Sequence, residues 1–273
     1  MLKQSQFMPC VLFKRFSQVV YLIISLSVLA PPSQASTLHL AADRWCPYNC
    51  ATYSQQPGYV LELAQLAFAP DYQVKLVEVP WSRALRNAKL GLYDGVIGAL
   101  PGEAPGFVYP RIPVGIARQV LVMRQDNPWQ YEGLISLHEL RIAVAADYAY
   151  SAELDGYIKA QQQRRDLVII RSEQPLERMH KLLQEGKIDA YIEDKTVVSY
   201  HAHLHSKNQQ IRFAAEFSAS PIYIAFSPAN PLSYQLAKRL SARLVELRNS
   251  GRLATLLARY GLQDWAPIAK PLQ

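Results

Sequence analysis

The feature that most constrains this chain is a regular alternation of short apolar segments with amphipathic ones. Residues 72–79 alternate apolar and polar side chains as a half-buried strand does, and residues 95–100 are almost wholly apolar, as buried parallel strands are. Before these strands, helical spacing places Val60, Leu63, Ala64, Ala67 and Phe68 on one face of a helix. Between the two strands, the same spacing places Ala84, Leu85 and Ala88 on one face of a second helix. This strand–helix order predicts a parallel sheet with helices on its faces.

A second set of strands and helices follows a passage rich in glycine and proline at residues 101–115. It runs from residue 140 to residue 217, and helices with an apolar stripe at Leu232, Leu236, Leu240, Leu244 and Leu247 close the chain. Each set is too short for a long open sheet, so the pattern favours two lobes with a cleft between them. In open α/β sheets, ligands bind beyond the carboxyl ends of the strands. Residues that follow strands are therefore the candidates for a site.

The N-terminal segment, residues 1–35, is predicted to be a signal peptide. It carries Lys3, Lys14 and Arg15 and no acid, then a mostly apolar run of 12 residues, 19–30, and small residues at Ser33 and Ala35. The run is shorter than the roughly 20 apolar residues that span a bilayer, which makes an uncleaved anchor the weaker alternative. We expect cleavage near Ala35 and a periplasmic protein of 238 residues with a net charge of +4.

Charge and motifs narrow the class of partner. The basic residues are scattered and no run of them alternates with aromatic residues, so no nucleic-acid partner is expected. In the sequence "HAHLH", only His201 and His205 would share a face of the predicted helix, and two imidazoles make a poor zinc site. These observations argue against a metal or a cofactor. We expect a small-molecule ligand and a monomer.

Two cysteines, Cys46 and Cys50, remain once Cys10 is removed with the leader. In an oxidising compartment a lone pair is most simply a disulfide. Their C-x-x-x-C spacing differs from the C-x-x-C of redox motifs, although a reactive pair stays the alternative. The sequence predicts a short stapled loop directly after the first strand.

Five segments, taken in their order and spacing, resemble the family 3 periplasmic solute-binding proteins of the polar amino acid type: "ADRWCPY", "PGYVLELAQLAF", "VPWSRALRNAKLGLYDGVIG", "EAPGFVYP" and "GKIDAYIED". The resemblance implies an α/β, two-lobed fold of the type II periplasmic-binding class, each lobe a mixed, mainly parallel sheet flanked by helices. It implies a discontinuous lobe 1 of residues 36–118 with 220–268, a lobe 2 of residues 119–219, and hinges near residues 117–123 and 219–226.

The same resemblance implies where a ligand would bind. Trp45 and Trp81 match the two aromatic residues that face each other across the ligand, and Asp194, beside Glu193, matches the aspartate that takes its ammonium. Tyr48 is a further candidate for contact. The alternatives are that the indoles are core residues and that Asp194 caps the helix that follows it.

The sequence departs from the family where the ligand's carboxylate would be held. Ala104 stands in place of the usual arginine, and "ADYAYS", residues 146–151, replaces the usual Gly-Ser/Thr turn. Arg83 or Arg111 would have to substitute, and we take Arg83, two residues after Trp81, as the anion contact.

The resemblance predicts a protein that captures a small polar, amino-acid-like solute by hinge closure. The closed form would be presented to an inner-membrane ABC transporter, or alternatively to a sensor. We expect no enzymatic activity. The alternative is a periplasmic enzyme of the same fold, similar to cyclohexadienyl dehydratases, with Glu103, Glu193 or Asp194 as its general acid.

Overall fold

The structure is a computed structural model that describes residues 4, 35–161, 163, 165–204 and 211–266. The chain separates into a unit of residues Met1–Ala35 and a folded unit of residues Ser36–Gln273. The predicted signal peptide thus falls outside the described residues except at Gln4 and Ala35, and so do His205 and residues 267–268 of the predicted lobe 1. Within the described ranges, no helix has the length and apolar character needed to cross a membrane.

The folded unit is built on one sheet of eight strands in the spatial order β2-β1-β3-β8-β4-β7-β5-β6. Parallel pairing joins β1 to β2 and β3, and β5 to β6 and β7. The two central strands, β4 and β8, pair antiparallel with each other and with their outer neighbours. The strands are β1 (Ser36–Ala42), β2 (Tyr72–Glu78), β3 (Gly95–Ala99), β4 (Gly115–Arg124), β5 (Ile142–Ala145), β6 (Leu167–Ile170), β7 (Ala190–Asp194) and β8 (Ile211–Phe226).

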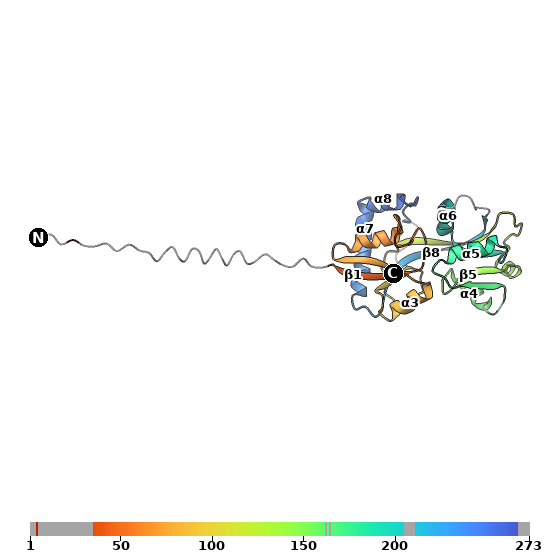
Figure 1. The fold of residues 1–273 in the computed structure, drawn as a ribbon, viewed down its shortest axis with the longest axis horizontal. Coiled ribbons are helices and arrows are strands. Elements are labelled where there is room, and N and C mark those ends of the chain that lie inside the picture. The colour runs from red at the N-terminus through yellow and green to blue at the C-terminus, as the bar shows by residue number, and fades with distance from the viewer. Residues whose placement is uncertain (1–3, 5–34, 162, 164, 205–210, 267–273) are drawn as a thin grey trace. The chain divides into compact units, whose positions relative to one another are not determined.

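Helices divide between the two ends of this sheet. Lobe 1, the side with β1, β2 and β3, carries α2 (Tyr59–Phe68), α3 (Trp81–Lys89), α7 (Ser233–Asn249) and α8 (Arg252–Ala258). Lobe 2, the side with β5, β6 and β7, carries the 3₁₀ helix η1 (Leu134–Glu139), α4 (Ala152–Gln161), α5 (Pro175–Gln184) and α6 (Lys195–Leu204). Figure 1 shows β8 running between the two groups of elements. This two-lobed, mainly parallel α/β architecture is the fold class that the sequence predicted.

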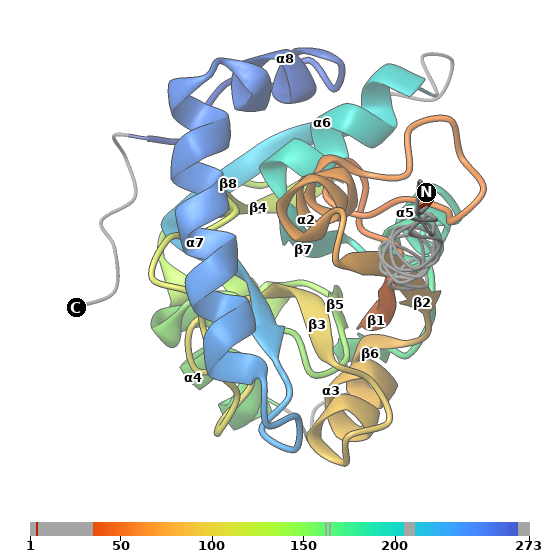
Figure 2. The same ribbon diagram turned by 90° about the vertical axis from the view of Figure 1, so that its left-hand side faces the viewer.

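The predicted apolar faces of the helices form the core of lobe 1. All five residues predicted for the buried face of α2 are buried, and α2 packs against α7, as Figure 2 shows. The stripe on α7 is buried from Leu236 to Leu247, but Leu232 is exposed because it precedes the first helical residue, Ser233. Burial of such faces, rather than helix propensity, supplies most of the stability of helices of this length.

One element is longer than the sequence indicated. Residues 211–217, which end the second set of strands and helices, and the passage after them form a single strand of 16 residues, β8. Pairing with β4 continues from Ile211 to Ile222, with register shifts between Arg118 and Val120 and between Leu121 and Val122 of β4. Pro221 does not break the strand because pairing with β3 begins only at Tyr223, so its missing N–H removes no bond to β3.

Candidate functional site

The candidate site lies where residues that follow strands of both lobes come together. From lobe 1 come Trp45 after β1, Trp81 at the start of α3, and Glu103 after β3. From lobe 2 come Tyr148 after β5 and Asp194 at the end of β7. These are the carboxyl ends of parallel strands, where open α/β sheets bind ligands.

A stapled loop holds the first of these aromatic residues. Cys46 and Cys50 are joined by a disulfide, with their Cα atoms 4.7 Å apart. The Trp45 N–H donates to the Asn49 carbonyl oxygen at 2.8 Å, and the ring of Tyr48 stacks on the Trp45 indole with centroids 4.3 Å apart. The loop therefore fixes Trp45, which is buried, at the end of β1.

The turn into α2 closes over this loop and requires a glycine. Gly58 has a φ of 108°, and a Cβ at that position would lie 2.4 Å from the Asn49 Cα and the Tyr48 carbonyl oxygen. The Gly58 N–H donates to the Tyr260 hydroxyl at 3.0 Å, which ties the loop to the residues after α8. Helix and loop thus support Trp45 from behind.

Each of the two predicted clamp residues donates to a carboxylate. The Trp45 Nε1–H donates to Glu193 Oε1 at 2.9 Å, across the lobes, and the Trp81 Nε1–H donates to Glu103 Oε1 at 2.8 Å. Glu103 also accepts from the Leu100 N–H at 2.8 Å and from the Ala149 N–H of lobe 2 at 2.8 Å. The carboxyl group of Glu103 therefore bridges the two lobes.

Tyr148 of lobe 2 contacts both indoles. Its ring meets Trp45 edge-on with centroids 6.5 Å apart and an interplanar angle of 78°, and it meets Trp81 at 6.4 Å and 83°. Its hydroxyl donates to Asp43 Oδ2 at 2.8 Å. The sequence paired Trp45 and Trp81 across a ligand, and in the structure the chain's own tyrosine touches both.

Carboxyl groups without cations surround these rings. Asp43, Glu193 and Asp194 are buried, and Glu103 is half-buried with both carboxylate oxygens hydrogen-bonded. In the part of the chain that the structure describes, no side chain of Lys, Arg or His pairs with any of the four. Burial is the largest cause that raises the pKa of Asp43 to about 7, of Glu103 and Glu193 to about 8, and of Asp194 to about 6.

Asp194 has its oxygens held by the protein. Oδ1 accepts from the Val197 N–H at 2.9 Å and from the Tyr48 hydroxyl at 3.1 Å, and Oδ2 accepts from the backbone N–H of Arg118 at 2.7 Å. The bond to Val197 is that of an N-cap of α6, the alternative role considered from the sequence. Its contact with a ligand stays a prediction.

Two buried acceptors at the site have no partner. Glu193 Oε2 and Gln119 Oε1 are buried and make no hydrogen bond to any residue that the structure describes. Gln119 lines, with Trp45, Trp81 and Tyr148, a small cavity of about 20 Å³. That volume holds about one water molecule. A larger open groove of about 1070 Å³ adjoins it and shares Glu103, Tyr148 and Ala149 as lining residues.

The structure does not bring the proposed anion contact to these cavities. Arg83 is exposed on α3 and lines neither the cavity nor the groove, and Arg111 is exposed, with its backbone N–H bonded to Ser241 Oγ. Ala104, which stands where the family's arginine would be, is buried. The role of Arg83 as an anion contact therefore stays a prediction. Of the residues that the structure describes, no arginine or lysine lines the small cavity, whereas Arg86, Lys89, Lys159 and Arg171 line the adjoining groove.

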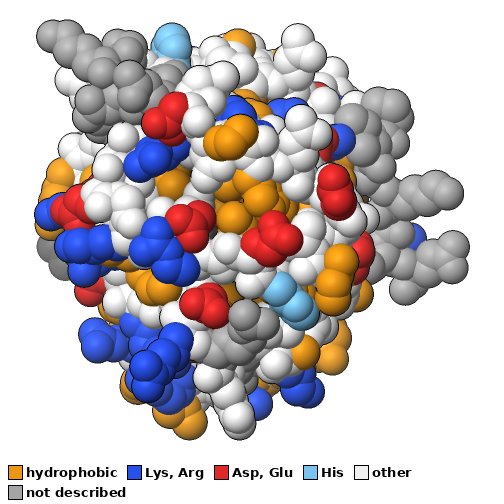
Figure 3. All heavy atoms as spheres, turned by 90° about the vertical axis from the view of Figure 1, so that its right-hand side faces the viewer, with side chains coloured by type: hydrophobic (Ala, Val, Ile, Leu, Met, Phe, Trp, Pro, Cys, Tyr) orange, Lys and Arg blue, Asp and Glu red, His pale blue; other side chains and the backbone are white. Residues whose placement is uncertain are grey.

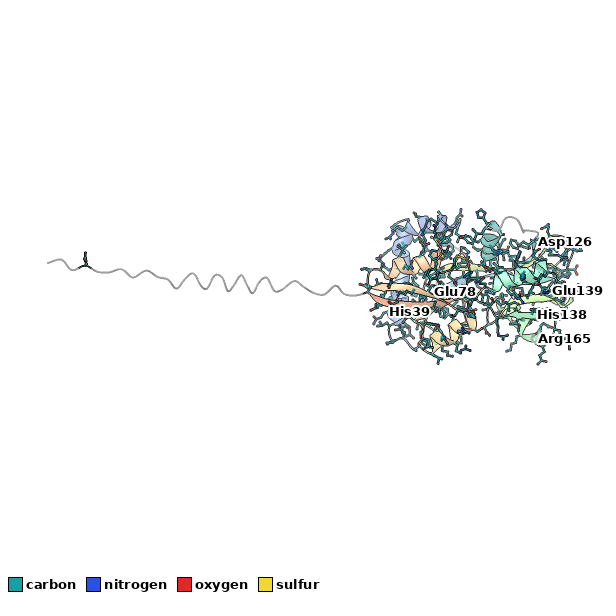
Figure 4. The ribbon with its side chains drawn as sticks, viewed as in Figure 1. His39, Glu78, Asp126, His138, Glu139 and Arg165 are labelled. Carbon is teal, nitrogen blue, oxygen red and sulfur yellow. A yellow bond between two sulfur atoms is a disulfide. The ribbon has the colours of Figure 1, made fainter. Side chains whose placement is uncertain are left out.

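A second surface lies at the end of lobe 2 that is far from β2. It does not have the buried indoles and buried carboxyl groups of the candidate site. Figure 3 shows there an apolar area edged by acidic side chains, and Figure 4 places Asp126, His138 and Glu139 at this end, far from Glu78 on β2. Glu139 accepts a bond from Trp129, and exposed Ile135 lies in the same 3₁₀ helix. The described residues contain no group of three or more His, Cys, Asp or Glu placed to hold a metal.

Fold and site together define a two-lobed α/β protein of the type II periplasmic-binding class, with its candidate site between the lobes. No family model and no curated protein matches the chain. Solved structures do. A histidine kinase sensor domain with similarity to periplasmic binding proteins has 20% identity and a TM-score of 0.67, covering 83% of this chain and 96% of that one.

Two further solved structures show the same likeness. The arginine-, lysine-, histidine-binding protein ArtJ of Geobacillus stearothermophilus has 15% identity, 84% and 96% coverage of this chain and its own, and a TM-score of 0.67. A structure from work on glutathione import through GshT and the cystine importer TcyBC of Streptococcus mutans has 18% identity, 83% and 95% coverage, and a TM-score of 0.67. At these identities the likeness establishes the fold that the resemblance predicted.

Proposed function

We propose that this chain is an exported solute-binding protein that captures a small, polar, amino-acid-like solute bearing a positive charge. The observation that carries the proposal is the group of carboxyls at Asp43, Glu103 and Glu193, which border the indoles and have no cationic partner. A buried carboxylate is stable when a cation pairs with it. A ligand's ammonium or guanidinium group supplies that cation, and an indole face adds a cation–π contact.

The replacement of the family's carboxylate-binding arginine by Ala104 also favours a cationic solute. Among the described residues, no arginine or lysine lines the small cavity, so the cavity itself favours the positive end of a solute, whereas basic side chains of the adjoining groove can meet its anionic end. Among the similar structures are proteins named for binding arginine, lysine and histidine, which fits a cationic ligand.

Capture would proceed by closure of the lobes about β4 and β8. We place lobe 1 at residues 36–118 with 220–268, lobe 2 at residues 119–219, and the hinges near residues 117–123 and 219–226. Both crossings are strands of the central pair, and Glu103–Ala149 and Tyr148–Asp43 are contacts that open as the lobes part. Closure around a solute shifts the population toward the closed form.

The partner would be an inner-membrane protein that recognises the loaded form, either an ABC permease or a sensor. Binding proteins of ABC importers and a kinase sensor domain both share the fold. The periplasmic location rests on the predicted leader, and mass analysis of the mature N-terminus tests cleavage after Ala35.

An enzyme of the same fold is the second candidate, and one observation favours it. Burial raises the pKa of Glu103 and Glu193 to about 8, so that both are protonated near neutral pH, as a general acid must be. Against it, no described arginine or lysine lines the small cavity between the indoles, and the basic residues that could hold the carboxylate of a cyclic acid line only the adjoining groove. Turnover assays with cyclic acids separate the two candidates.

Calorimetry with arginine, lysine, putrescine and glutamate tests the proposed function. We expect at least one of the three cationic solutes to bind and glutamate not to bind. Asp43→Asn should weaken the cation that binds, whereas Asp126→Asn, on the far end of lobe 2, should leave it unchanged. Binding of glutamate alone, or cation binding that is indifferent to Asp43→Asn, would refute the proposal. Mass spectrometry of any solute that co-purifies then identifies the natural ligand.

A further inference from the structure

We propose that Tyr148 is a resident side chain that occupies the place of the ligand's own ring. Capture would then exchange Tyr148 for a solute that carries an aromatic ring with a hydrogen-bond donor, in addition to its cation. This inference rests on the proposed function and names the class of solute, an arylalkylamine, that the same cleft accepts.

The contacts of Tyr148 are those of a bound ring. Its edge-on contacts with Trp45 and Trp81, at centroid distances of 6.5 and 6.4 Å, have the geometry that aromatic pairs prefer. Its hydroxyl donates to Asp43 at 2.8 Å, a carboxyl of the opposite lobe that is itself buried. A binding site would hold a phenol in the same way, with aromatic contacts on two sides of the ring and a hydrogen bond to its hydroxyl.

The backbone directs this side chain into the cleft. Tyr148 follows Asp147, which has a φ of 61°, a left-handed conformation that aspartate tolerates better than most residues. The next residue, Ala149, donates its N–H to Glu103 of lobe 1. The turn after β5 is thus fastened on both sides of Tyr148, by a local turn and by a bond across the lobes.

The space that remains shows why an exchange is needed. With Tyr148 in place, the cavity between Asp43, Trp45 and Trp81 has about 20 Å³, room for about one water molecule. No solute of the size of an amino acid fits there until the tyrosine leaves. The open groove of about 1070 Å³ shares Tyr148 in its lining, so rotation of the side chain toward the groove vacates the site.

The chemistry of the vacated site defines the solute. Two indoles select a flat ring, and the Asp43 carboxyl selects a donor at its far end. Glu103 and Glu193, bonded to the two indoles, then lie beside the same ring and suit an amine. Tyramine combines these features, and p-cresol reproduces the tyrosine side chain alone.

Calorimetry with p-cresol and tyramine on wild type, Tyr148→Ala and Tyr131→Ala tests the inference. Tyr131 is a half-buried tyrosine of lobe 2 that packs on Trp129 and Phe217, away from the cleft, and serves as the matched control. In wild type, Tyr148 would fill the site most of the time, and the apparent affinity for a ligand falls in proportion to the fraction of time that the site is free. Both probes should therefore bind Tyr148→Ala about tenfold or more tightly than wild type. Tyr131→Ala should bind like wild type.

Equal binding of both probes by wild type and folded Tyr148→Ala would overturn the inference, since removing the resident ring would then free no site. Should Tyr148→Ala not fold, Tyr148→Phe decides, because it keeps the ring and removes only the bond to Asp43. It should bind tyramine several-fold more tightly than wild type, and unchanged binding would count against the exchange. Failure of the proposed function would look different from failure of this inference. Arginine, lysine and putrescine would then bind no variant, whereas p-cresol would still report whether Tyr148 fills a ring site.

Discussion

Replacing Glu193 by glutamine should change how the stability of the protein depends on pH. Glu193 is 1% exposed, and burial is the main cause that raises its pKa from 4.5 to about 8. A carboxyl whose pKa is raised in the folded state binds its proton more tightly there than in the unfolded chain. Its contribution to stability is therefore complete below about pH 4.5 and is lost as the pH rises to about 8.

The structure sets the size of this effect and makes glutamine a fair substitute. A rise of the Glu193 pKa from 4.5 to about 8 corresponds to a free energy on the order of 5 kcal/mol. Opening of the cleft hydrates the carboxylate and reduces that figure. A glutamine amide oxygen can keep both bonds that Oε1 accepts, from Trp45 and from the Asp194 N–H, and its NH₂ replaces the unpaired Oε2.

Urea unfolding of wild type and Glu193→Gln from pH 5 to pH 9 measures the difference. The two should be nearly equal in free energy of unfolding at pH 5, and the variant should gain on wild type by a few kcal/mol at pH 9. Glu132→Gln, an exposed position in lobe 2, is the control and should follow wild type at every pH. A difference between Glu193→Gln and wild type that is the same at pH 5 and pH 9 would refute the reasoning.

The remaining predictions concern the ligand, the helix cap and the loop. If the Trp81 indole is a binding hot spot, Trp81→Ala should weaken solute binding by about 2 kcal/mol or more, as measured by calorimetry. A Trp81→Ala variant that binds the solute like wild type would place the site elsewhere. Affinity for a cationic solute should rise between pH 6 and pH 8, because the cation displaces protons from Asp43 and Glu193, and a flat profile would contradict the carboxyl partners. Asp194→Ala should lower stability by about 1 kcal/mol through loss of the cap of α6, seen in urea unfolding. Replacing Cys46 and Cys50 by serine should lower stability by about 1–3 kcal/mol, and two free thiols in native, unreduced protein would disprove the disulfide.

The local periodicity of apolar residues predicted the helices and strands because each such element buries one of its faces. The buried face of α2, the helix at Lys195–Leu204 and the strand before the disulfide loop are all as the sequence indicated. The continuity of β8 was missed, since pairing with β4, far away in the sequence, holds residues 211–222 in one strand.

The site was predicted in part, for the same reason. Trp45, Trp81 and Asp194 do lie at strand ends, where the sequence placed them. Tyr148 was visible only as a departure from the family's turn, and Asp43 gave no signal, because their bond joins residues 105 positions apart. Glu103 was considered only as a possible acid, and no sequence pattern states that its carboxylate bridges the lobes.

The order of the strands has a consequence for how the chain matures during synthesis. Lobe 1 takes its first three strands from residues 36–99, but β3 pairs with β8, and α2 packs on α7, which are made more than a hundred residues later. An emerging chain that ends before residue 226 holds a sheet edge and a helix face with nothing to cover them. Lobe 2, whose β5, β6 and β7 are contiguous in sequence, can gather most of its strands earlier. The N-terminal part of the folded unit is therefore the last to be completed, only once the C-terminal helices have been made.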